Sequence, residues 1–328
     1  MRKEKKELTV IIPNWNGKKL LKNCLFSLYK QSFKNFEVVV VDNGSTDGSE
    51  EWIRTTYPEV TIISFSKNKG FAFAVNKGIA FSQTPYILVL NNDTVLERNC
   101  VKVLISEIKR RKKVAAITPK VLLMDSPALI DSAGDYMNTA GQAFHRGFRE
   151  PKEKYNKKEE VFLVPATALL INRKLFGKIG KFDETFFAYG EDVDWSFRAR
   201  LQGYKFLYEP EAIVFHKGSV TGKRLSSFLQ YLQFRNSMII VIKNFPIGLF
   251  LRRFRFILIP LTVLHAAFYL LKRGYKREVL DSFSFVFKNF RKLLKARREI
   301  LRKRRIKIDK IDKMMVKKEW RLLKCFQW

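Results

Sequence analysis

The residues best suited to chemistry in this chain lie where an apolar run ends abruptly. Residues 86–90 read YILVL and are followed at once by Asn-Asn-Asp-Thr at 91–94. A run without polar alternation is typical of a strand covered on both faces, so the residues after it emerge at the edge of a sheet. A carboxylate such as Asp93 at that edge is an oxygen ligand of the kind that hard divalent ions prefer. The same tetrapeptide also fits a turn or the start of a helix over 96–109, and by itself it favours the turn.

A second candidate is a cluster of acids in an otherwise basic chain. Residues 182–195 place five acids among aromatic side chains. The dipole of a helix that begins near Glu191 accounts for Glu191 and Asp194. It does not account for the aromatic loop before them, which resembles a pocket wall or a platform for a sugar ring. A carboxylate at such a place is a natural general base.

Two further loops and one histidine complete the candidates. The loop 42–48 carries Asp42, which could accept hydrogen bonds from a nucleobase or a ribose, and Lys69 in the segment 68–78 could bind phosphate. As bare strings both segments indicate only turns. His216 follows an apolar strand. A histidine at such a place, taken alone, favours a structural role, whereas beside a metal-bound Asp93 it becomes a second ligand.

The elements that must position these residues alternate between strand and helix. Apolar runs separated by segments with helical spacing predict a parallel sheet covered on both faces, and every polar cluster then lies at one rim of that sheet. From 114 to 216 the pattern is less regular and predicts a mixed sheet. The expected strands are 10–12, 36–41, 60–65 and 86–90, the helices 20–29, 48–57 and 72–81, and the polar clusters 14–17, 42–47, 68–70 and 91–93.

The composition predicts an anionic binding partner. The 328 residues carry 63 Lys and Arg against 31 Asp and Glu, which gives a net charge of +32. Such an excess indicates a phosphate-bearing substrate, a nucleic acid or an anionic membrane surface. Three widely spaced cysteines indicate neither a zinc site nor a disulfide framework and favour a reducing environment. The apolar stretch 8–13 is too short for a signal-peptide core, so we expect the first strand there.

The carboxyl-terminal third has a different character, with apolar stretches interrupted by basic residues. The longest, 256–271, has 16 residues and contains Pro260, whereas a bilayer span needs about 20. Arginines at 252, 253 and 255 and the pair Lys272 and Arg273 flank it, which favours a helix lying in the membrane interface. A re-entrant hairpin and a buried helix of a soluble domain are the alternatives. Residues 272–328 hold 21 basic and 6 acidic residues, and the part after 287 fits a basic amphipathic helix on anionic lipid or a solvated basic helix.

Taken in order, the polar motifs resemble those of a known family. No P-loop, dinucleotide fingerprint or G-x-S-x-G elbow occurs. The chain instead resembles family 2 inverting glycosyltransferases, in the branch often labelled rhamnosyltransferase-like, over roughly residues 7–220. The segments that carry the resemblance are 9–17, 41–47, 68–78, 90–94, 180–184 and 191–194, with His216.

This resemblance implies a fold and a set of roles. It implies the GT-A fold, a Rossmann-like, mostly parallel α/β sheet, here with a C-terminal helical membrane-associating region, and a nucleotide-diphosphate sugar donor with Mg²⁺ or Mn²⁺. Asp192 matches the general base of a single inverting displacement, and Asp93 with His216 the metal site. Asparagine at 91 and 92 leaves one carboxylate for the ion, and 165–168 lack the glycine usual in relatives. The predicted donor-side residues are Pro13, Asn14, Asn16, Asp42, Lys69 and Asn92, and those of the acceptor and sugar pocket are Trp15, Tyr189, Glu191 and Trp195.

We therefore expect a catalytic domain over 1–220, a membrane-associating helical region over 221–287 and a basic amphipathic tail over 288–328. The expected acceptor is a lipid-linked or cell-surface glycan, the expected location is the cytoplasmic face of the cell membrane, and no nucleic acid is expected. Two other classes stay open. One is a nucleic-acid-binding protein that uses the charge of +32, and the other is a catalytically silent, membrane-bound scaffold with the same fold.

Overall fold

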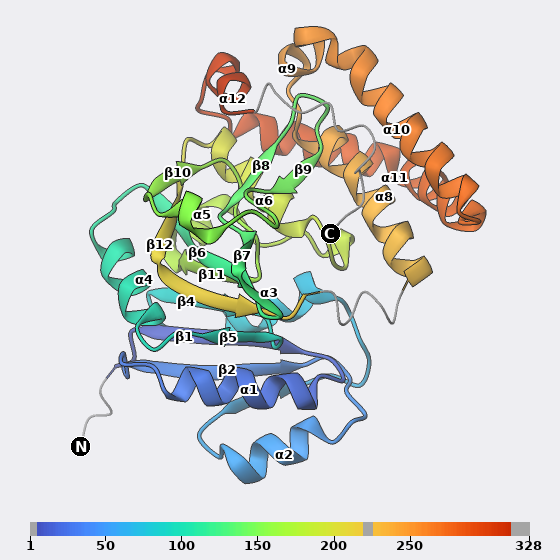
Figure 1. Cartoon of the computed structure of the whole chain (residues 1–328). Coiled ribbons are helices and arrows are strands. Elements are labelled where there is room, and N and C mark those ends of the chain that lie inside the picture. The colour runs from blue at the N-terminus through green and yellow to red at the C-terminus, as the bar shows by residue number, and fades with distance from the viewer. Residues whose placement is uncertain (1–4, 219–225, 316–328) are drawn as a thin grey trace.

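A computed structural model describes residues 5–218 and 226–315 of the chain (Figure 1). Its centre is a large mixed sheet with the strand order β10-β12-β6-β11-β4-β1-β2-β3, to which β5 and β7 add at β12 and β6. The strands are β1 (Leu8–Asn14), β2 (Phe36–Asp42), β3 (Thr61–Ser64), β4 (Tyr86–Leu90), β5 (Thr94–Leu96), β6 (Val114–Leu123), β7 (Ser126–Ser132), β10 (Glu159–Val161), β11 (Ala168–Asn172) and β12 (Lys205–His216).

The first half of the chain forms the parallel part of this sheet. Strands β3, β2, β1 and β4 lie side by side in parallel, joined by α1 (Lys18–Tyr29), α2 (Ser49–Thr56) and α3 (Phe71–Phe81). Alternate residues of β1 pack on opposite faces: Val10 and Ile12 lie in the cluster with α1, and Ile11 in the cluster with α3. Burial on both faces explains why these strands read as continuous apolar runs.

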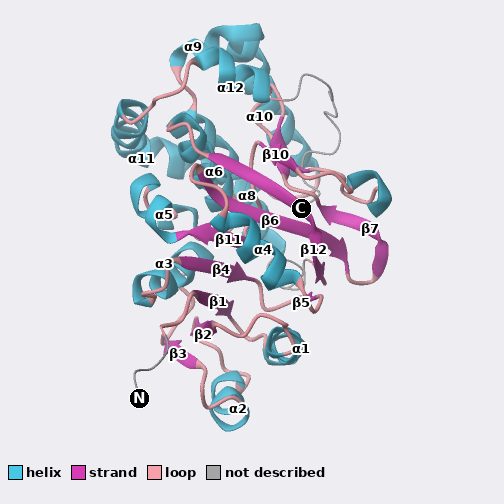
Figure 2. Cartoon of the chain, turned by 90° about the vertical axis from the view of Figure 1, so that its left-hand side faces the viewer, coloured by secondary structure: helices cyan, strands magenta, loops and turns pink. Residues whose placement is uncertain are grey.

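The middle of the chain makes the sheet mixed, as the irregular pattern predicts. Strand β11 pairs antiparallel with both β4 and β6, and β12 runs parallel to β6. Short β5 pairs antiparallel with the end of β12, which brings Thr94 opposite His216. Helices α4 (Cys100–Lys109), α5 (Arg173–Ile179) and α6 (Glu191–Leu201) cover this part (Figure 2). Strands β8 (Asp135–Met137) and β9 (Ala143–His145) form a separate two-stranded sheet.

From residue 226 onward, every regular element of the described chain is a helix, and these helices pack beside the second half of the sheet (Figure 1). Helix α8 contacts α6, α10 and α11. A bend with left-handed backbone at Arg253 and Phe254 separates α9 from α10. These helices are α8 (Ser226–Asn244), α9 (Ile247–Leu251), α10 (Arg255–Lys272), α11 (Lys276–Arg302) and α12 (Ile308–Met314).

One apolar helical stretch of the described residues, 247–272, is long and apolar enough to be a candidate for membrane association, with a mean hydropathy of 1.8. Of the arginines expected to flank it at the membrane, Arg255 is buried and, together with Arg253, pairs with Asp312 of α12. Arg252 pairs with Asp309. These charges therefore hold α12 against the bend, while Lys272 and Arg273 at the other end are exposed.

The predicted α/β class, with a mostly parallel sheet at its amino-terminal half and an apolar C-terminal helix, is confirmed. The division at residues 220 and 287 stays a prediction, and α11 runs across the second boundary without interruption. The basic tail predicted over 288–328 includes the second half of α11 and all of α12, and its last residues, 316–328, lie outside the described chain.

Candidate functional site

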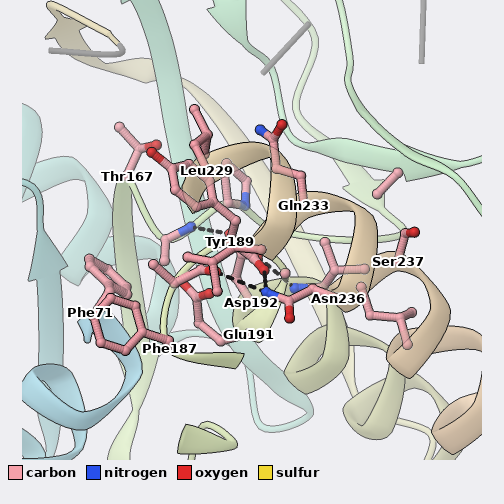
Figure 3. A pocket seen from close by; sticks show the side chains of 18 of the residues that line it. Phe71, Thr167, Phe187, Tyr189, Glu191, Asp192, Leu229, Gln233, Asn236 and Ser237 are labelled. Atoms are coloured by element: carbon pink, nitrogen blue, oxygen red, sulfur yellow. Dashed lines mark hydrogen bonds between the residues drawn. The ribbon is translucent and has the colours of Figure 1, made fainter. Parts of the chain in front are cut away.

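The carboxyl ends of β1, β2 and β4 border one cavity of about 350 Å³. The loop before α6, the hairpin β8–β9 and the helices α8 and α10 complete its wall. Figure 3 shows Asp192, Glu191 and Tyr189 grouped beside Asn236 of α8, with Phe71 and Phe187 together at one side. The cavity thus lies where open α/β sheets bind ligands, at the carboxyl ends of their strands.

A network of short polar side chains shapes the strand ends. Asn14 is buried, and its Nδ2 donates to Asp42 Oδ2 at 3.1 Å and to Ser49 Oγ at 3.0 Å. Asn92 Nδ2 donates in turn to Asn14 Oδ1 at 2.8 Å. A Cβ atom at Gly17 would lie 2.7 Å from Asn14 Oδ1 and would clash with Asn92, so the network needs glycine there. The strand ends are therefore fixed relative to one another before any ligand binds.

Asp93 and His216 meet because β5 pairs with β12. His216 Nε2 lies 3.3 Å from Asp93 Oδ1, and its Nδ1 lies 2.8 Å from Asp131 Oδ2 at the end of β7. Burial opposes a charge on the ring, but the two carboxylates outweigh it and raise the pKa of His216 to about 10. A carboxylate that holds one ring nitrogen orients the other toward a metal ion in many metalloproteins.

Asp192 stands at the first turn of α6 and lines the same cavity. Its Oδ2 accepts from the Ala166 amide at 3.0 Å and its Oδ1 from the Val193 amide at 2.8 Å. Burial, followed by the charge of Asp135, raises the pKa of Asp192 to about 6 in spite of these amides. A carboxylate with that pKa is ionised at neutral pH and is basic enough to accept a proton.

Glu191, next to Asp192, is buried, and its Oε2 has no hydrogen-bond partner in the described chain. Burial and the neighbouring Asp192 raise the pKa of Glu191 well above its usual value. Glu191 therefore holds its proton more strongly than an exposed glutamic acid does. Two adjacent acids in different environments suit different roles toward a sugar.

The loop before α6 is strained and is held from α8. Phe187 and Tyr189 have φ values of 64° and 65°, a region that costs a residue other than glycine about 1–3 kcal/mol. Asn236 Nδ2 of α8 donates to the carbonyls of Phe186, Ala188 and Tyr189 at 3.1, 2.9 and 2.6 Å. Arg235 adds bonds to the carbonyls of Thr185 and Phe186, both at 2.9 Å. Helix α8 therefore fixes the loop that leads to Glu191 and Asp192.

The cavity changes character from one end to the other. Asparagines and Asp93 line the end at the strands, whereas apolar residues of α8 and α10 line the opposite end, namely Leu229, Leu232, Ile240, Val241, Ile259, Val263 and Ala266. Among the described lining residues there is no lysine or arginine, although the chain has a net charge of +32. The described basic residues therefore lie outside the lining of this cavity.

Most of the predicted site residues come together here. The cavity is lined by Pro13, Asn14, Trp15, Asn92, Asp93, Tyr189, Glu191, Asp192 and His216. Four others lie elsewhere. Asp42 and Asn16 lie behind the lining, where Asp42 accepts from Asn14 and the Ser45 amide and Asn16 Oδ1 accepts from the Thr46 amide.

Lys69 is exposed and lies over the rings of Phe65 and Phe73, 5.0 and 4.8 Å from their centroids. Trp195 is fully buried in the core, where its indole donates to the Gly180 carbonyl at 3.0 Å. It follows the catalytic acids by one helical turn and faces the sheet, so it supports α6 and does not line the acceptor pocket.

The prediction from sequence missed several residues of the site. Asp131 orients His216, and His145 lines the cavity opposite a buried partner, Asp135. Asn236 is a third. Asp131 and His145 lie in a stretch without regular pattern, and Asn236 lies in a segment that reads as a membrane-associated helix. A stretch with Asp, Gly and His between strands was the only signal for the first two.

The donor atoms fit a divalent ion. Asp93 and His216 face one another, Asp131 holds the imidazole from behind, and Asn91 Oδ1 at the same strand end is buried without a hydrogen-bond partner in the described chain. No group of three or more His, Cys, Asp or Glu among the described residues could hold a metal. Two protein ligands suit an ion that takes its other ligands from a bound diphosphate and water.

Comparison with known proteins relates more than half of this chain to one family. Residues 9–180 match the model of glycosyl transferase family 2. A relative from Mycobacterium tuberculosis, N-acetylglucosaminyl-diphospho-decaprenol L-rhamnosyltransferase, is 28% identical over 68% of this chain and 80% of its own length. Low-salt glycan biosynthesis hexosyltransferase Agl10 from Haloferax volcanii is 26% identical over 70% of this chain and 74% of its own.

Two solved structures share the fold. GalNAc-T7 with UDP, GalNAc and Mn²⁺ superposes with a TM-score of 0.55 at 17% identity, over 64% of this chain and 43% of its own. The mannosyltransferase PcManGT from Pyrobaculum calidifontis, in complex with GDP-Man and Mn²⁺, gives 0.53 at 15% identity, over 92% of this chain and 86% of its own. At such identity the likeness concerns the GT-A fold alone.

Proposed function

The chain belongs to glycosyl transferase family 2, and from that premise we propose that it transfers a sugar, with inversion, from a nucleotide-diphosphate sugar to a hydroxyl of a lipid-linked glycan. The observation that supports this proposal is that Asp192 and the pair Asp93 and His216 line one and the same cavity. A single displacement requires a base and a site for the leaving diphosphate within reach of the same sugar.

The residues of the chain divide the reaction between them. The asparagine network at the strand ends receives the nucleotide side of the donor. Asp192 accepts the proton of the acceptor hydroxyl as its oxygen bonds to the anomeric carbon and the bond from that carbon to the diphosphate breaks. Glu191 and Tyr189 remain to hydrogen-bond sugar hydroxyls. Asp93 and His216 would hold Mg²⁺ or Mn²⁺, whose chemistry is to neutralise charge on the departing diphosphate.

The end of the cavity lined by α8 and α10 supports the proposal that the acceptor is linked to a lipid. Helices α8 and α10 contribute mostly apolar residues to its walls, beside the polar Gln233, Asn236, Ser237 and Thr262. Helix α10 also exposes Leu261, Leu264 and Phe268 on its outer face. One helix therefore borders the reaction site and presents an apolar surface outside it. An acceptor whose sugar reaches Asp192 while its lipid lies along α10 fits both faces.

Transfer is tested with a panel of nucleotide sugars, by following release of the nucleoside diphosphate. Donor binding is measured first, as Mn²⁺-dependent thermal stabilisation by each nucleotide sugar. Loss of the proposed base in Asp192→Asn should lower the transfer rate about 10²–10⁴-fold. The control is Asp125→Asn, at a carboxylate whose side chain is 70% exposed. Undiminished transfer by Asp192→Asn would overturn the assignment of the base.

Attachment to the cytoplasmic face of the membrane is a second part of the proposal. We expect the outer face of α10, with Lys272 and Arg273, to lie on anionic lipid. In flotation with phosphatidylglycerol vesicles, Phe268→Glu should weaken binding. Its matched control is Phe26→Glu on α1, because the two phenylalanines are 55% and 56% exposed. Equal loss in both variants would contradict a membrane surface centred on α10.

A further inference from the structure

Beside the base Asp192 the cavity contains a histidine whose role the reaction above leaves open. His145 ends β9, directly opposite Asp135 of β8, and its Nδ1 lies 2.8 Å from Asp135 Oδ1. The Asp135 side chain is 2% exposed and that of His145 20% exposed. Ser132 Oγ also donates to Asp135 Oδ1 at 2.9 Å, so the carboxylate is fixed on both sides. The ring is therefore held in one orientation at the cavity wall.

The hairpin that carries His145 is tied to the segment that holds Asp192. The backbone amides of Asp135 and Leu163 donate to each other's carbonyls, both at 3.0 Å. Three residues beyond Leu163, the amide of Ala166 donates to Asp192 Oδ2. The two side chains thus line one cavity from segments joined by a short path of backbone hydrogen bonds, and their relative position does not depend on a mobile loop.

The charged residues of the cavity lining indicate a role for His145. The described lining residues include the acids Asp93, Glu191 and Asp192 and no lysine or arginine, so His145 and His216 are the side chains there that can carry positive charge. His216 belongs to the pair with Asp93. His145 is left to offset the acids around the base, where burial and Asp135 disfavour an ionised Asp192.

We propose that His145, held by Asp135, is a positioning residue: it provides a fixed positive charge that keeps Asp192 ionised until the acceptor hydroxyl arrives. This inference rests on the proposed role of Asp192 as the base. The charged groups that face His145 support it. Burial opposes a charge on the ring, but Asp135, Asp131 and Asp192 outweigh it and raise the pKa of His145 to about 9. The ring is therefore an imidazolium at neutral pH.

The proposal predicts a reciprocal coupling. If the imidazolium stabilises the Asp192 carboxylate, His145→Gln should move the acid limb of the kcat/KM profile to higher pH by about one unit, because the base then ionises later. By linkage, Asp192→Asn should lower the pKa of His145 by a similar amount. Asp135→Asn should lower the pKa of His145 toward its ordinary range.

The chain has only three histidines, so the ring titrations can be followed by NMR in the full-length protein labelled at histidine, with the signal of His145 assigned by its loss in His145→Gln. His265→Gln on α10 is the matched control and should leave both titrations unchanged. A His145 that titrates identically in the wild type and in Asp192→Asn would overturn the proposal, as would an acid limb that His145→Gln does not move. The ring titrations need no substrate, so absent sugar transfer counts against the proposed function alone.

Discussion

Asp192 and Asp194 of α6 are two positions apart and have opposite environments. Asp194 is buried between Lys243, at 2.8 Å, and Arg198, at 2.8 Å, and these cations hold its pKa well below the usual range although burial opposes them. The pKa of Asp192 is instead raised to about 6. Only the second can exchange a proton near neutral pH, so one carboxylate is structural and its neighbour is the candidate base.

The raised pKa of Asp192 sets the pH dependence of transfer. The base is active when ionised, so kcat/KM should be on its plateau above pH 7 and fall tenfold per unit as the pH decreases below about 6. The measurement is the initial rate of nucleoside diphosphate release across pH at saturating Mn²⁺. A plateau that continues unchanged to pH 4.5 would exclude a base with a raised pKa.

Asp131 should affect metal binding through His216. Asp131→Asn removes the carboxylate behind the imidazole, and loss of such a partner costs about 10–100-fold in metal affinity. We expect weaker Mn²⁺ binding in the presence of a nucleoside diphosphate, measured by calorimetry, and transfer that recovers at higher Mn²⁺. Asp125→Asn, on the exposed carboxylate paired with Lys217, is the control. Equal Mn²⁺ affinity in both variants would remove Asp131 from the site.

At the scale of elements, α8 acts as a support for the catalytic loop. The buried amide of Asn236 donates to three carbonyls of the loop, at residues 186, 188 and 189. Lys243, the penultimate residue of α8, bonds Asp183 and Asp194 at 2.5 and 2.8 Å. Strain at Phe187 and Tyr189 can persist only if the surroundings fix it. The geometry of Asp192 therefore depends on a helix distant in sequence.

Asn236→Ala tests this dependence. Leaving buried carbonyls without a donor should lower the free energy of unfolding by about 1–3 kcal/mol and should also lower kcat, because the loop relaxes. Asn289→Ala is the matched control: Asn289 of α11 donates within its own helix, to the Phe285 carbonyl at 2.9 Å. A variant at 236 that loses stability but keeps its full kcat would show that the loop does not need α8 for catalysis.

The sequence was sufficient for the regular elements and insufficient for contacts between distant ones. Four apolar runs with helices between them predict the parallel half of the sheet because a two-sided strand has a local signature. Asp93 and His216 were paired from their ligand chemistry and from the family resemblance, since no local pattern places β5 against β12. Trp195 was misplaced because its neighbours in sequence line the cavity, while helical geometry turns position 195 toward the core.

At the scale of the whole molecule, the carboxyl-terminal helices both complete the cavity and present the apolar surface. A chain ending at residue 218 should therefore lose transfer activity even toward soluble acceptors, and not merely leave the membrane. The measurement compares the transfer activity of this shortened chain with that of full-length Phe268→Glu. The full-length variant should dissociate from vesicles but keep the stability of the catalytic domain. Full transfer by the shortened chain would show that the helices are an anchor only.

The positions of the charges distinguish binding to anionic membranes from binding of the donor, which the net charge of +32 alone does not. The described cavity lining holds neither lysine nor arginine, while α11 carries many of both. Binding to anionic vesicles should weaken steeply as salt increases from about 0.05 to 0.5 M, because exposed charges are screened, while donor binding changes less. Vesicle flotation and donor titration at the same salt concentrations measure the two effects.

The pairing of β12 limits how the length of this chain can vary. Three residues of β12, Pro210 to Ala212, have no partner in β6 between Glu209 and Ile213, after which His216 lies opposite Leu123 of β6 and Thr94 of β5. An insertion at that irregularity can be absorbed, whereas one residue gained or lost after Ile213 would turn His216 to the other face of the sheet. The short segment between Ile213 and His216 should therefore accept changes of side chain but no change of length.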